Sequence, residues 1–373
     1  MKLGVTMVTQ EKDVIGFKEL FSIIVIIVGT KASDMTSTLL FEHSLNAAWM
    51  VVIFSFLIIL PSLLVLNQLL EKYKSKNLFE ITQLLLGRKI AFVIGLAFLL
   101  YAVTKTAIDT RSYSDQLITI NLPKTPMFIL YILLLVVCLW GAKRGWETIG
   151  SVAFMVVPYI LLALSLLYLL LFKEIQINRM FPLFGLGYPE LAKASFKFTS
   201  VFSDIFLLAI MYPFVKKHKT YAKGIVSSAI FTVILMSLLL LLYALIFDYR
   251  SLDKITYPFN EAIRFVSIGK AITNIETFFI TFWLLAVFVK FTVYIYITSK
   301  IFGFVFHIEE FEHTLLPITI LILILGMIPE NDILNIFFIK SDIVYQFKYI
   351  FLTLPFILWI FSKFKGVKTN ESS

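Results

Sequence analysis

The sequence predicts an all-α membrane protein with about ten transmembrane helices. Hydrophobic residues make up 59% of the 373 positions and charged residues 15%, whereas a soluble domain carries roughly 25% charged residues. The apolar residues occur in runs of about 18 to 25, and a helix of that length crosses a hydrocarbon core about 30 Å thick. We therefore expect one transmembrane domain over residues 1–364 and a short cytoplasmic tail over residues 365–373.

Each span is defined by an apolar run that ends at polar or helix-breaking residues. We expect helices at residues 17–37, 47–70, 90–121, 126–140, 149–172, 195–215, 223–247, 271–306, 315–328 and 345–364. Basic residues follow the second span (Lys72, Lys74, Lys76), the fourth (Lys143, Arg144) and the sixth (Lys216, Lys217, Lys219). Prolines and glycines interrupt the long connection 173–194. The spans then fall into two halves of five helices, at about 17–172 and 195–364.

Basic residues are more frequent on the N-terminal side of the predicted membrane than on the opposite side. The positive-inside rule places the richer side, and with it both termini, in the cytoplasm. The formal net charge of +9 follows from this asymmetry and from contact with anionic membrane lipid. A nucleic-acid partner is therefore not expected.

Residues suited to catalysis or metal binding are sparse. The single cysteine, Cys138, lies in an apolar run, and the histidines His43, His218, His307 and His313 lack metal-ligand spacing. The chain contains no P-loop, dinucleotide-binding glycine motif or nucleophile elbow. We expect no catalytic residue, no metal, no cofactor and no enzymatic activity.

Two spans carry polar interruptions at corresponding positions of the two halves. The first contains the stretch Gly29, Thr30, Lys31, Ala32, Ser33 and Asp34, and the sixth contains Thr199, Ser200, Val201, Phe202, Ser203 and Asp204. Irregular backbone survives in a membrane only where it lines a cavity or is buried in protein. Paired interruptions are typical of a transporter site in which half-helices face a zwitterion. The alternative is that Gly29 and Ser203 simply ease helix packing.

Charged residues inside the predicted spans point to the same region, because each costs roughly 2.5 to 3.5 kcal/mol to insert unless it is paired or hydrated. On the third span Tyr101, Lys105 and Asp109 share one face, and Arg111 is spaced to pair with Asp115. We expect these residues to line a hydrated core between spans 1, 3, 6 and 8. The alternative is a structural ion-pair lattice, with Lys105 bound to Asp109.

The eighth span continues this pattern. Glu276, Trp283, Lys290 and Tyr294 form one stripe along the helix. A stripe with two charges is not expected to face lipid.

Several local motifs resemble those of the B subunits of bacterial spore nutrient-germinant receptors. The most specific lies in the eighth span, where Ile275, Glu276, Thr277 and Phe278 precede Phe282 and Trp283. Asp109, Thr110 and Arg111 in the third span, and Tyr212, Pro213 and Phe214 ahead of a basic cluster, support it. The family is similar to amino-acid/polyamine/organocation permeases. The resemblance implies a LeuT-type fold, a 5+5 inverted repeat with broken helices 1 and 6.

The resemblance also implies a function and partners. It implies a germinant-sensing subunit in the spore inner membrane that works with an A subunit and a lipoprotein C subunit. By local matching, the family's germinant pocket falls near Lys105, Ser203, Lys290 and Tyr294. The chain departs from the family at Gly29, Thr30 and Lys31, where a Gly-x-Gly break is common. A basic pocket suits a more acidic or more polar germinant than neutral L-alanine.

Three functional hypotheses follow. The first is a receptor subunit in which the backbone of residues 29–32 and the Lys31 ammonium meet the carboxylate of a small nutrient, an amino acid by expectation. Lys105, Lys290 and Tyr294 then shape the pocket, while Asp109 and Glu276 balance its charge. The second is a proton-coupled amino-acid symporter. The third is a structural scaffold with a vestigial pocket.

Overall fold

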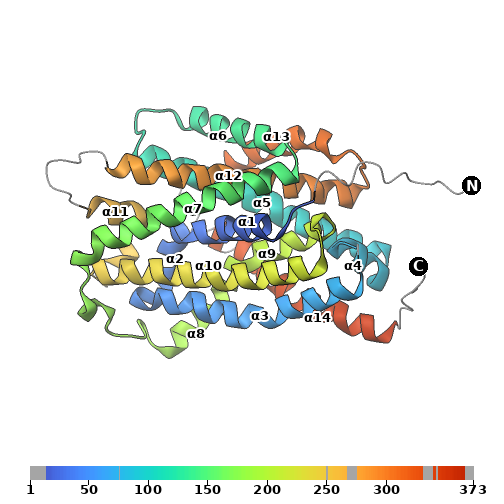
Figure 1. Ribbon diagram of the computed structural model, residues 1–373, viewed down its shortest axis with the longest axis horizontal. Helices are drawn as coiled ribbons and strands as arrows, with labels where there is room; N and C mark the ends of the chain where they lie inside the picture. Colours follow the sequence, from blue (N-terminus) through green and yellow to red (C-terminus); the bar gives the residue numbers. More distant parts are fainter. Residues whose placement is uncertain are drawn as a thin grey trace, which may run out of the picture.

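The computed structural model describes residues 14–74, 76–248, 251–266, 275–330, 339–341 and 343–365. In this part of the chain the secondary structure is helical apart from one isolated bridge between Ile15 and Val215. Most of the longer helices run side by side along the long axis of the bundle (Figure 1). The predicted all-α fold class is confirmed.

The helices follow one another in this order. The first part of the chain contains α1 (Phe17–Gly29), η1 (Thr30–Ala32), α2 (Met35–Ser44), η2 (Leu45–Ala47), α3 (Ala48–Lys72), α4 (Leu78–Leu86), α5 (Arg88–Ile120), α6 (Met127–Ala142) and α7 (Trp146–Leu171). Two 3-10 turns, η3 (Phe172–Glu174) and η4 (Ile177–Met180), lie in the connection that follows. The second part contains α8 (Tyr188–Lys197), η5 (Phe198–Phe202), α9 (Ser203–Leu207), η6 (Leu208–Phe214), α10 (His218–Ile246), η7 (Leu252–Lys254), α11 (Pro258–Arg264), α12 (Ile275–Phe306), η9 (Phe311–Thr314), α13 (Leu315–Gly326), η11 (Val344–Phe347) and α14 (Lys348–Phe364).

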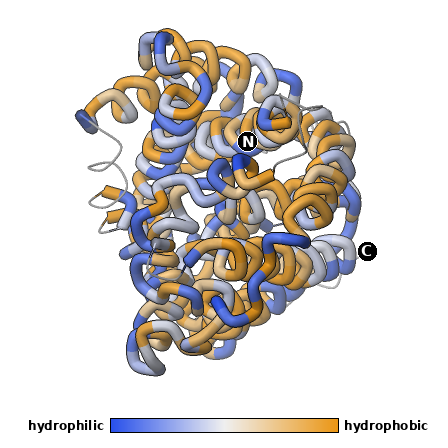
Figure 2. The backbone as a smooth tube through the Cα atoms, turned by 90° about the vertical axis from the view of Figure 1, so that its left-hand side faces the viewer, coloured by the Kyte–Doolittle hydropathy of each residue, from blue (hydrophilic) through white to orange (hydrophobic). Residues whose placement is uncertain are grey.

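The outer surface of the bundle is apolar. Seven helical segments among the described residues are long and apolar enough to cross a membrane, and Met127–Ala142 and Phe311–Gly326 are apolar but shorter. Large side chains point outward from these helices; Val93, Leu162 and Leu169 are 64%, 60% and 74% exposed. Hydrophobic residues dominate the tube in Figure 2. Because so large an apolar surface is not stable in water, these faces contact membrane lipid. The chain is a multi-pass membrane protein.

Some boundaries differ from those predicted. The predicted span 17–37 covers α1, η1 and only the start of α2, which continues to Ser44. The short helix α4 was not predicted, although its start has a clear local cause. The Asn77 side chain accepts hydrogen bonds from Phe79 N and Glu80 N, at 2.9 and 3.0 Å, and Glu80 Oε2 accepts one from Asn77 N. Residues 271–274 of the predicted eighth helix and 366–373 of the predicted tail lie outside the described residues.

The first helix lies in the centre of the bundle. Every residue from Ile23 to Val28 is buried, and α1 packs against α7, α10 and α12, between which it is seen in Figure 1. A helix that is apolar all round is stable only when other helices surround it. The point where α1 ends, at Gly29, is therefore enclosed by protein. The division of the chain into two halves stays a prediction.

Candidate functional site

The backbone leaves the α-helical path after Gly29. The segment Thr30–Ala32 forms the 3-10 turn η1, and α2 begins at Met35 with Asp34 as its N-cap, whose Oδ1 accepts a hydrogen bond from Thr36 N at 2.6 Å. Side chains from other helices supply partners for carbonyls in this segment. Tyr243 OH donates to Ala32 O at 3.2 Å, and Gln116 Nε2 donates to Ser33 O at 3.2 Å. These two carbonyls of the irregular backbone are thus bonded within the protein, as a membrane interior requires.

A second irregular segment lies beside the first. Between α8 and α10 the chain forms η5, the short α9 and η6, so 3-10 geometry flanks a single α-helical turn at Ser203–Leu207. Ser203 Oγ donates to Ser200 O at 2.5 Å and also contacts the Tyr101 hydroxyl. The Lys31 ammonium donates to Val201 O. Lys31 of the first irregular segment is therefore bound to the backbone of the second irregular segment.

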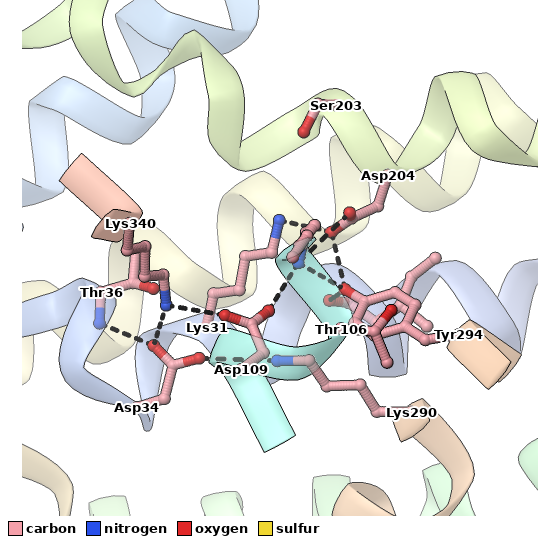
Figure 3. Close-up of polar contacts among 12 residues, drawn as sticks. Lys31, Asp34, Thr36, Thr106, Asp109, Ser203, Asp204, Lys290, Tyr294 and Lys340 are labelled. Carbon is pink, nitrogen blue, oxygen red and sulfur yellow. Dashed lines mark hydrogen bonds and ion pairs between the residues drawn. The ribbon is translucent and has the colours of Figure 1, made fainter. Parts of the chain in front are cut away.

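Seven buried charged side chains connect these two segments in an alternating series, which we call the lysine–aspartate chain. In order they are Lys290, Asp34, Lys340, Asp109, Lys105, Asp204 and Lys31. None is more than 5% exposed. Figure 3 shows the carboxylates of Asp34, Asp109 and Asp204 turned toward the lysines between them.

The contact distances in the lysine–aspartate chain differ from one aspartate to the next. Asp109 lies 2.6 Å from Lys105 Nζ and 3.1 Å from Lys340 Nζ. Asp34 lies farther from its partners, at 3.5 Å from Lys290 and 4.0 Å from Lys340. Asp204 contacts Lys31 directly and Lys105 at 3.5 Å. Each aspartate is therefore shared by two lysines.

Aromatic side chains enclose the lysine–aspartate chain. Tyr294 OH donates to Asp204 Oδ2 at 2.9 Å and accepts from Lys105 Nζ at 3.1 Å. At the other end, Lys290 Nζ donates to Tyr113 OH at 2.7 Å and lies 4.4 Å from the centre of that ring. Such rings stabilise a desolvated ammonium through their π face.

The lysine–aspartate chain joins elements that are far apart in sequence. Its members come from η1, the N-cap of α2, α5, α9, α12 and the short segment 339–341. A buried charge that loses its partner costs about 3 to 5 kcal/mol. Movement of either irregular segment relative to α5 or α12 must therefore exchange one ion pair for another, and the arrangement is suited to switching between discrete states.

A small cavity lies against this series. It has a volume of about 10 Å³ and is lined by Lys31, Thr36, Tyr101, Lys105, Asp109, Ser200, Val201, Lys340, Val344 and Tyr345. We call it the inner cavity; it has the room of about one water molecule. A second cavity of about 50 Å³ lies on the other side of η1, where Gly29 and Thr30 meet apolar residues such as Phe282 and Trp283. Within the described residues no group of three or more His, Cys, Asp or Glu could hold a metal ion.

Most residues predicted for the site meet at this place. Lys31, Asp34, Lys105, Asp109 and Lys290 are members of the lysine–aspartate chain, and Tyr101, Ser203 and Tyr294 bind to it or to its supporting backbone. Thr30 O lies 3.2 Å from the Tyr113 hydroxyl. Gly29 lines the apolar cavity instead, and Ala32 takes part through its carbonyl oxygen.

Two residues expected in the charge network lie elsewhere. Arg111 Nε binds Asp115 Oδ2 at 2.8 Å and its NH1 group binds Gly326 O at 3.2 Å, on the side of α5 that faces α13. Glu276 is exposed in the first turn of α12. The charge network as predicted is corrected accordingly, because the lysine–aspartate chain contains neither residue.

Three members of the site were not among the predicted site residues. Asp204 stands next to Ser203 in the sixth span, so the polar interruption itself pointed to it. Tyr113 continues the i+4 series of Tyr101, Lys105 and Asp109, and this periodicity was a usable signal. Lys340 lies between the predicted ninth and tenth spans, where nothing in the local sequence distinguishes it from a solvated loop lysine.

Comparison with known proteins agrees with this architecture. The family model described as spore germination protein, a spore permease, matches residues 14–333. The chain belongs to this family. Among its relatives in Bacillus subtilis (strain 168), spore germination protein YndE is 23% identical over 81% of this chain and 83% of its own length. Spore germination protein KB is 22% identical over 97% of this chain and 98% of its own length.

Solved structures show which fold this family member adopts. MhsT in complex with L-phenylalanine has a TM-score of 0.64 at 16% identity, covering 95% of this chain and 90% of MhsT. The nucleobase-cation-symport transporter Mhp1 has a TM-score of 0.64 at 12% identity, covering 94% and 78%. The fold is therefore of the LeuT type. The family and the fold place this spore germination permease among receptors and transporters, not among enzymes.

Proposed function

We propose that the protein is a germinant-receptor subunit that binds a small nutrient, an amino acid by expectation, at the lysine–aspartate chain and signals germination. The observation that carries the proposal is the meeting of seven buried charges at two irregular backbone segments. A purely structural membrane protein has no need for so costly an arrangement. The family supports a role in germination, and MhsT, solved with L-phenylalanine, supports a small-molecule site in this fold.

The residues have distinct roles in this proposal. The Lys31 ammonium and the backbone of Gly29–Ala32 meet the nutrient's carboxylate, while Lys105, Lys290 and Tyr294 shape the pocket. In the present arrangement Lys31 is bound to Asp204 and to Val201 O. A ligand carboxylate that replaces Asp204 as the partner of Lys31 breaks the ion pair that joins the two irregular segments.

Loss of this ion pair changes the balance between two states of the subunit. A ligand shifts such an equilibrium only by its difference in affinity for the two states. Competition between the ligand carboxylate and Asp204 for Lys31 supplies that difference. Signalling then requires no passage of the nutrient across the membrane.

The surroundings of the site belong to the same proposal. The subunit lies in the spore inner membrane with both termini in the cytoplasm, in contact with membrane lipid. It works with a germinant-receptor A subunit and a lipoprotein C subunit. The family membership and the excess of basic residues on one side of the predicted spans support these assignments.

Germination of spores that carry Lys105→Ala or Lys290→Ala tests the proposal. We expect the nutrient concentration for half-maximal germination to rise at least about tenfold, because each change removes an ammonium that shapes the pocket. Lys124→Ala, in an exposed loop, is the control, and immunoblots of spore membranes establish equal protein levels. An unchanged concentration dependence at normal level would remove these lysines from the site.

A second candidate is a proton-coupled amino-acid symporter. The transporter structures that share the fold favour it, as do the buried lysines and aspartates, which can exchange protons. Uptake of radiolabelled amino acids into proteoliposomes containing only this chain distinguishes the two. Concentrative uptake driven by a proton gradient supports the symporter, whereas binding without uptake supports the receptor.

A further inference from the structure

The lysine–aspartate chain begins and ends with a lysine. Its four lysines and three aspartates carry a formal net charge of +1. Among the described residues, all three buried aspartates already belong to it, and the other buried charged side chains, Arg111 and Lys348, are basic. An uncompensated charge in a protein interior is costly. No further buried acid in the described part of the chain balances the excess.

The excess charge falls next to the inner cavity. Lys31, Lys105 and Lys340 line it, whereas Asp109 is its single acidic wall residue among those described. Thr36 and Tyr345, which carry hydroxyl groups, also line this cavity. Ammonium and hydroxyl groups are the donors that bind carboxylate oxygens. The inner cavity thus has the chemistry of an anion site.

A larger basic cavity has a wall residue next in sequence to one that lines the inner cavity. It has a volume of about 360 Å³ and is lined by Lys193, Phe196, Lys197, Ser341, Gln346 and Lys348. We call it the basic vestibule. Ser341 in its wall directly follows Lys340, which lines the inner cavity, so the same short segment separates the two.

Lysines give the basic vestibule its charge. Glu190 offsets Lys193 through an exposed ion pair at 3.3 Å, and Lys197 Nζ lies 2.9 Å from His43 Nε2. The charged residues that line the basic vestibule, among those described, are all lysines. Clefts of one charge sign concentrate ligands of the opposite sign. The vestibule therefore favours the approach of anions.

We infer that the ligand of this site is a small carboxylate with one net negative charge, such as an acidic amino acid or a hydroxy acid. This inference rests on the proposed function and specifies its ligand. Because the inner cavity as described has room for about one water molecule, the ligand-bound state is a wider one, in which the ligand carboxylate lies among Lys31, Lys105 and Lys340 and neutralises the excess charge of the lysine–aspartate chain. A neutral zwitterion leaves that charge uncompensated, because its own ammonium cancels its carboxylate.

Charge-matched ligands test the inference on the purified full-length chain in lipid nanodiscs. Isothermal titration calorimetry compares L-glutamate with L-glutamine, L-aspartate with L-asparagine, and L-lactate with sodium chloride at equal ionic strength. We expect the anionic member of at least one amino-acid pair, or lactate, to bind at least about tenfold more tightly than the neutral amino acids, a difference of about 1.4 kcal/mol.

The variant Lys340→Gln tests the charge count directly. It leaves three one-to-one pairs, Lys290 with Asp34, Lys105 with Asp109 and Lys31 with Asp204, so the excess charge disappears. We expect the preference for the anionic ligand to fall to about twofold or less, while Lys340→Arg keeps it. Lys124→Gln removes a charge from an exposed loop and serves as the matched control. A preference that persists in Lys340→Gln would overturn the inference.

The remaining outcomes separate this inference from the proposed function. Equal or tighter binding of L-glutamine and L-asparagine overturns the ligand class, and means that one lysine is neutral, but it leaves the nutrient site standing. Chloride binding as tight as that of every carboxylate overturns the carboxylate assignment in the same way. If none of these ligands binds to the wild-type chain, the inferred ligand class fails, whereas the nutrient site itself stands or falls with the germination of the Lys105→Ala and Lys290→Ala spores. The wild-type comparison decides the matter even if a lysine variant does not fold.

Discussion

The helix α5 carries two ion pairs with the same i,i+4 spacing and very different surroundings. Lys105 and Asp109 lie 2.6 Å apart and are both almost fully buried. Lys105 also contacts Asp204 on α9, and Asp109 also contacts Lys340. Arg111 and Asp115 lie 2.8 Å apart, but the Asp115 side chain is 16% exposed and the further partners of Arg111 lie at Gly326 and Met327. Arg111 follows Lys105 by six residues, so the two pairs lie on different faces of α5. Equal spacing therefore does not mean equal function.

The comparison shows what makes a charged pair costly to change. Loss of Asp109 takes the closest carboxylate from two buried lysines, whereas loss of Asp115 leaves Arg111 with the Gly326 carbonyl. The first pair belongs to a network in which Lys105 and Asp109 each contact a further charged residue. The second fastens one helix to its neighbour. Four variants sharpen or break this distinction.

The largest effect is expected for Asp109→Ala. It leaves Lys105 and Lys340 without their closest carboxylate, so we expect the free energy of unfolding to fall by about 3 to 5 kcal/mol. Thermal unfolding of the purified chain in detergent, followed by tryptophan fluorescence, measures the loss. A variant as stable as the wild type would show that the buried charges are compensated in some other way.

A smaller effect is expected for Tyr113→Phe. The Tyr113 hydroxyl accepts a hydrogen bond from Lys290 and lies 2.8 Å from Asp34 Oδ2, so its removal weakens one end of the lysine–aspartate chain. We expect a loss of about 1 to 3 kcal/mol in the same unfolding assay. The ring stacked on Trp283 is retained, with centroids 5.2 Å apart. A loss as large as that of Asp109→Ala would mean that the hydroxyl, not the carboxylate, organises the network.

The variant Asp115→Ala is the matched control on α5. It breaks an i,i+4 pair like that of Lys105 and Asp109, but at a partly solvated position, so we expect a loss of about 1 kcal/mol or less. The nutrient dependence of germination is expected to be unchanged, because Arg111 lies outside the site. If germination shifts as strongly as in Lys105→Ala, the distinction between the two pairs is wrong.

The smallest effect is expected for Glu276→Gln. This side chain is exposed at the start of α12 and away from the lysine–aspartate chain. Neither thermal stability nor the nutrient concentration for half-maximal germination should change measurably. A clear shift in the germination response would return Glu276 to the charge network predicted from the sequence.

The sequence singled out most residues that meet at the lysine–aspartate chain because the signals there are local, while their role as a site stays a prediction. The stripe Tyr101, Lys105 and Asp109 follows from helical periodicity, and Lys290 and Tyr294 follow from the same spacing on another helix. The polar residues after Val28 pointed to the first irregular segment. Lys340 was missed because no periodic pattern surrounds it, and Arg111 was included because its spacing alone resembles that of Lys105.

Hydropathy, helical periodicity and the cost of burying charge are properties of neighbouring residues, so the sequence by itself determined the membrane class, most spans and the faces that carry charge. The tertiary structure alone decided which lysine binds which aspartate. Asp204 and Lys31, like Lys340 and Asp109, come from segments far apart in the chain. Their pairing depends on how the helices pack, because ion pairs act over a few ångströms in space and carry no signature of sequence separation.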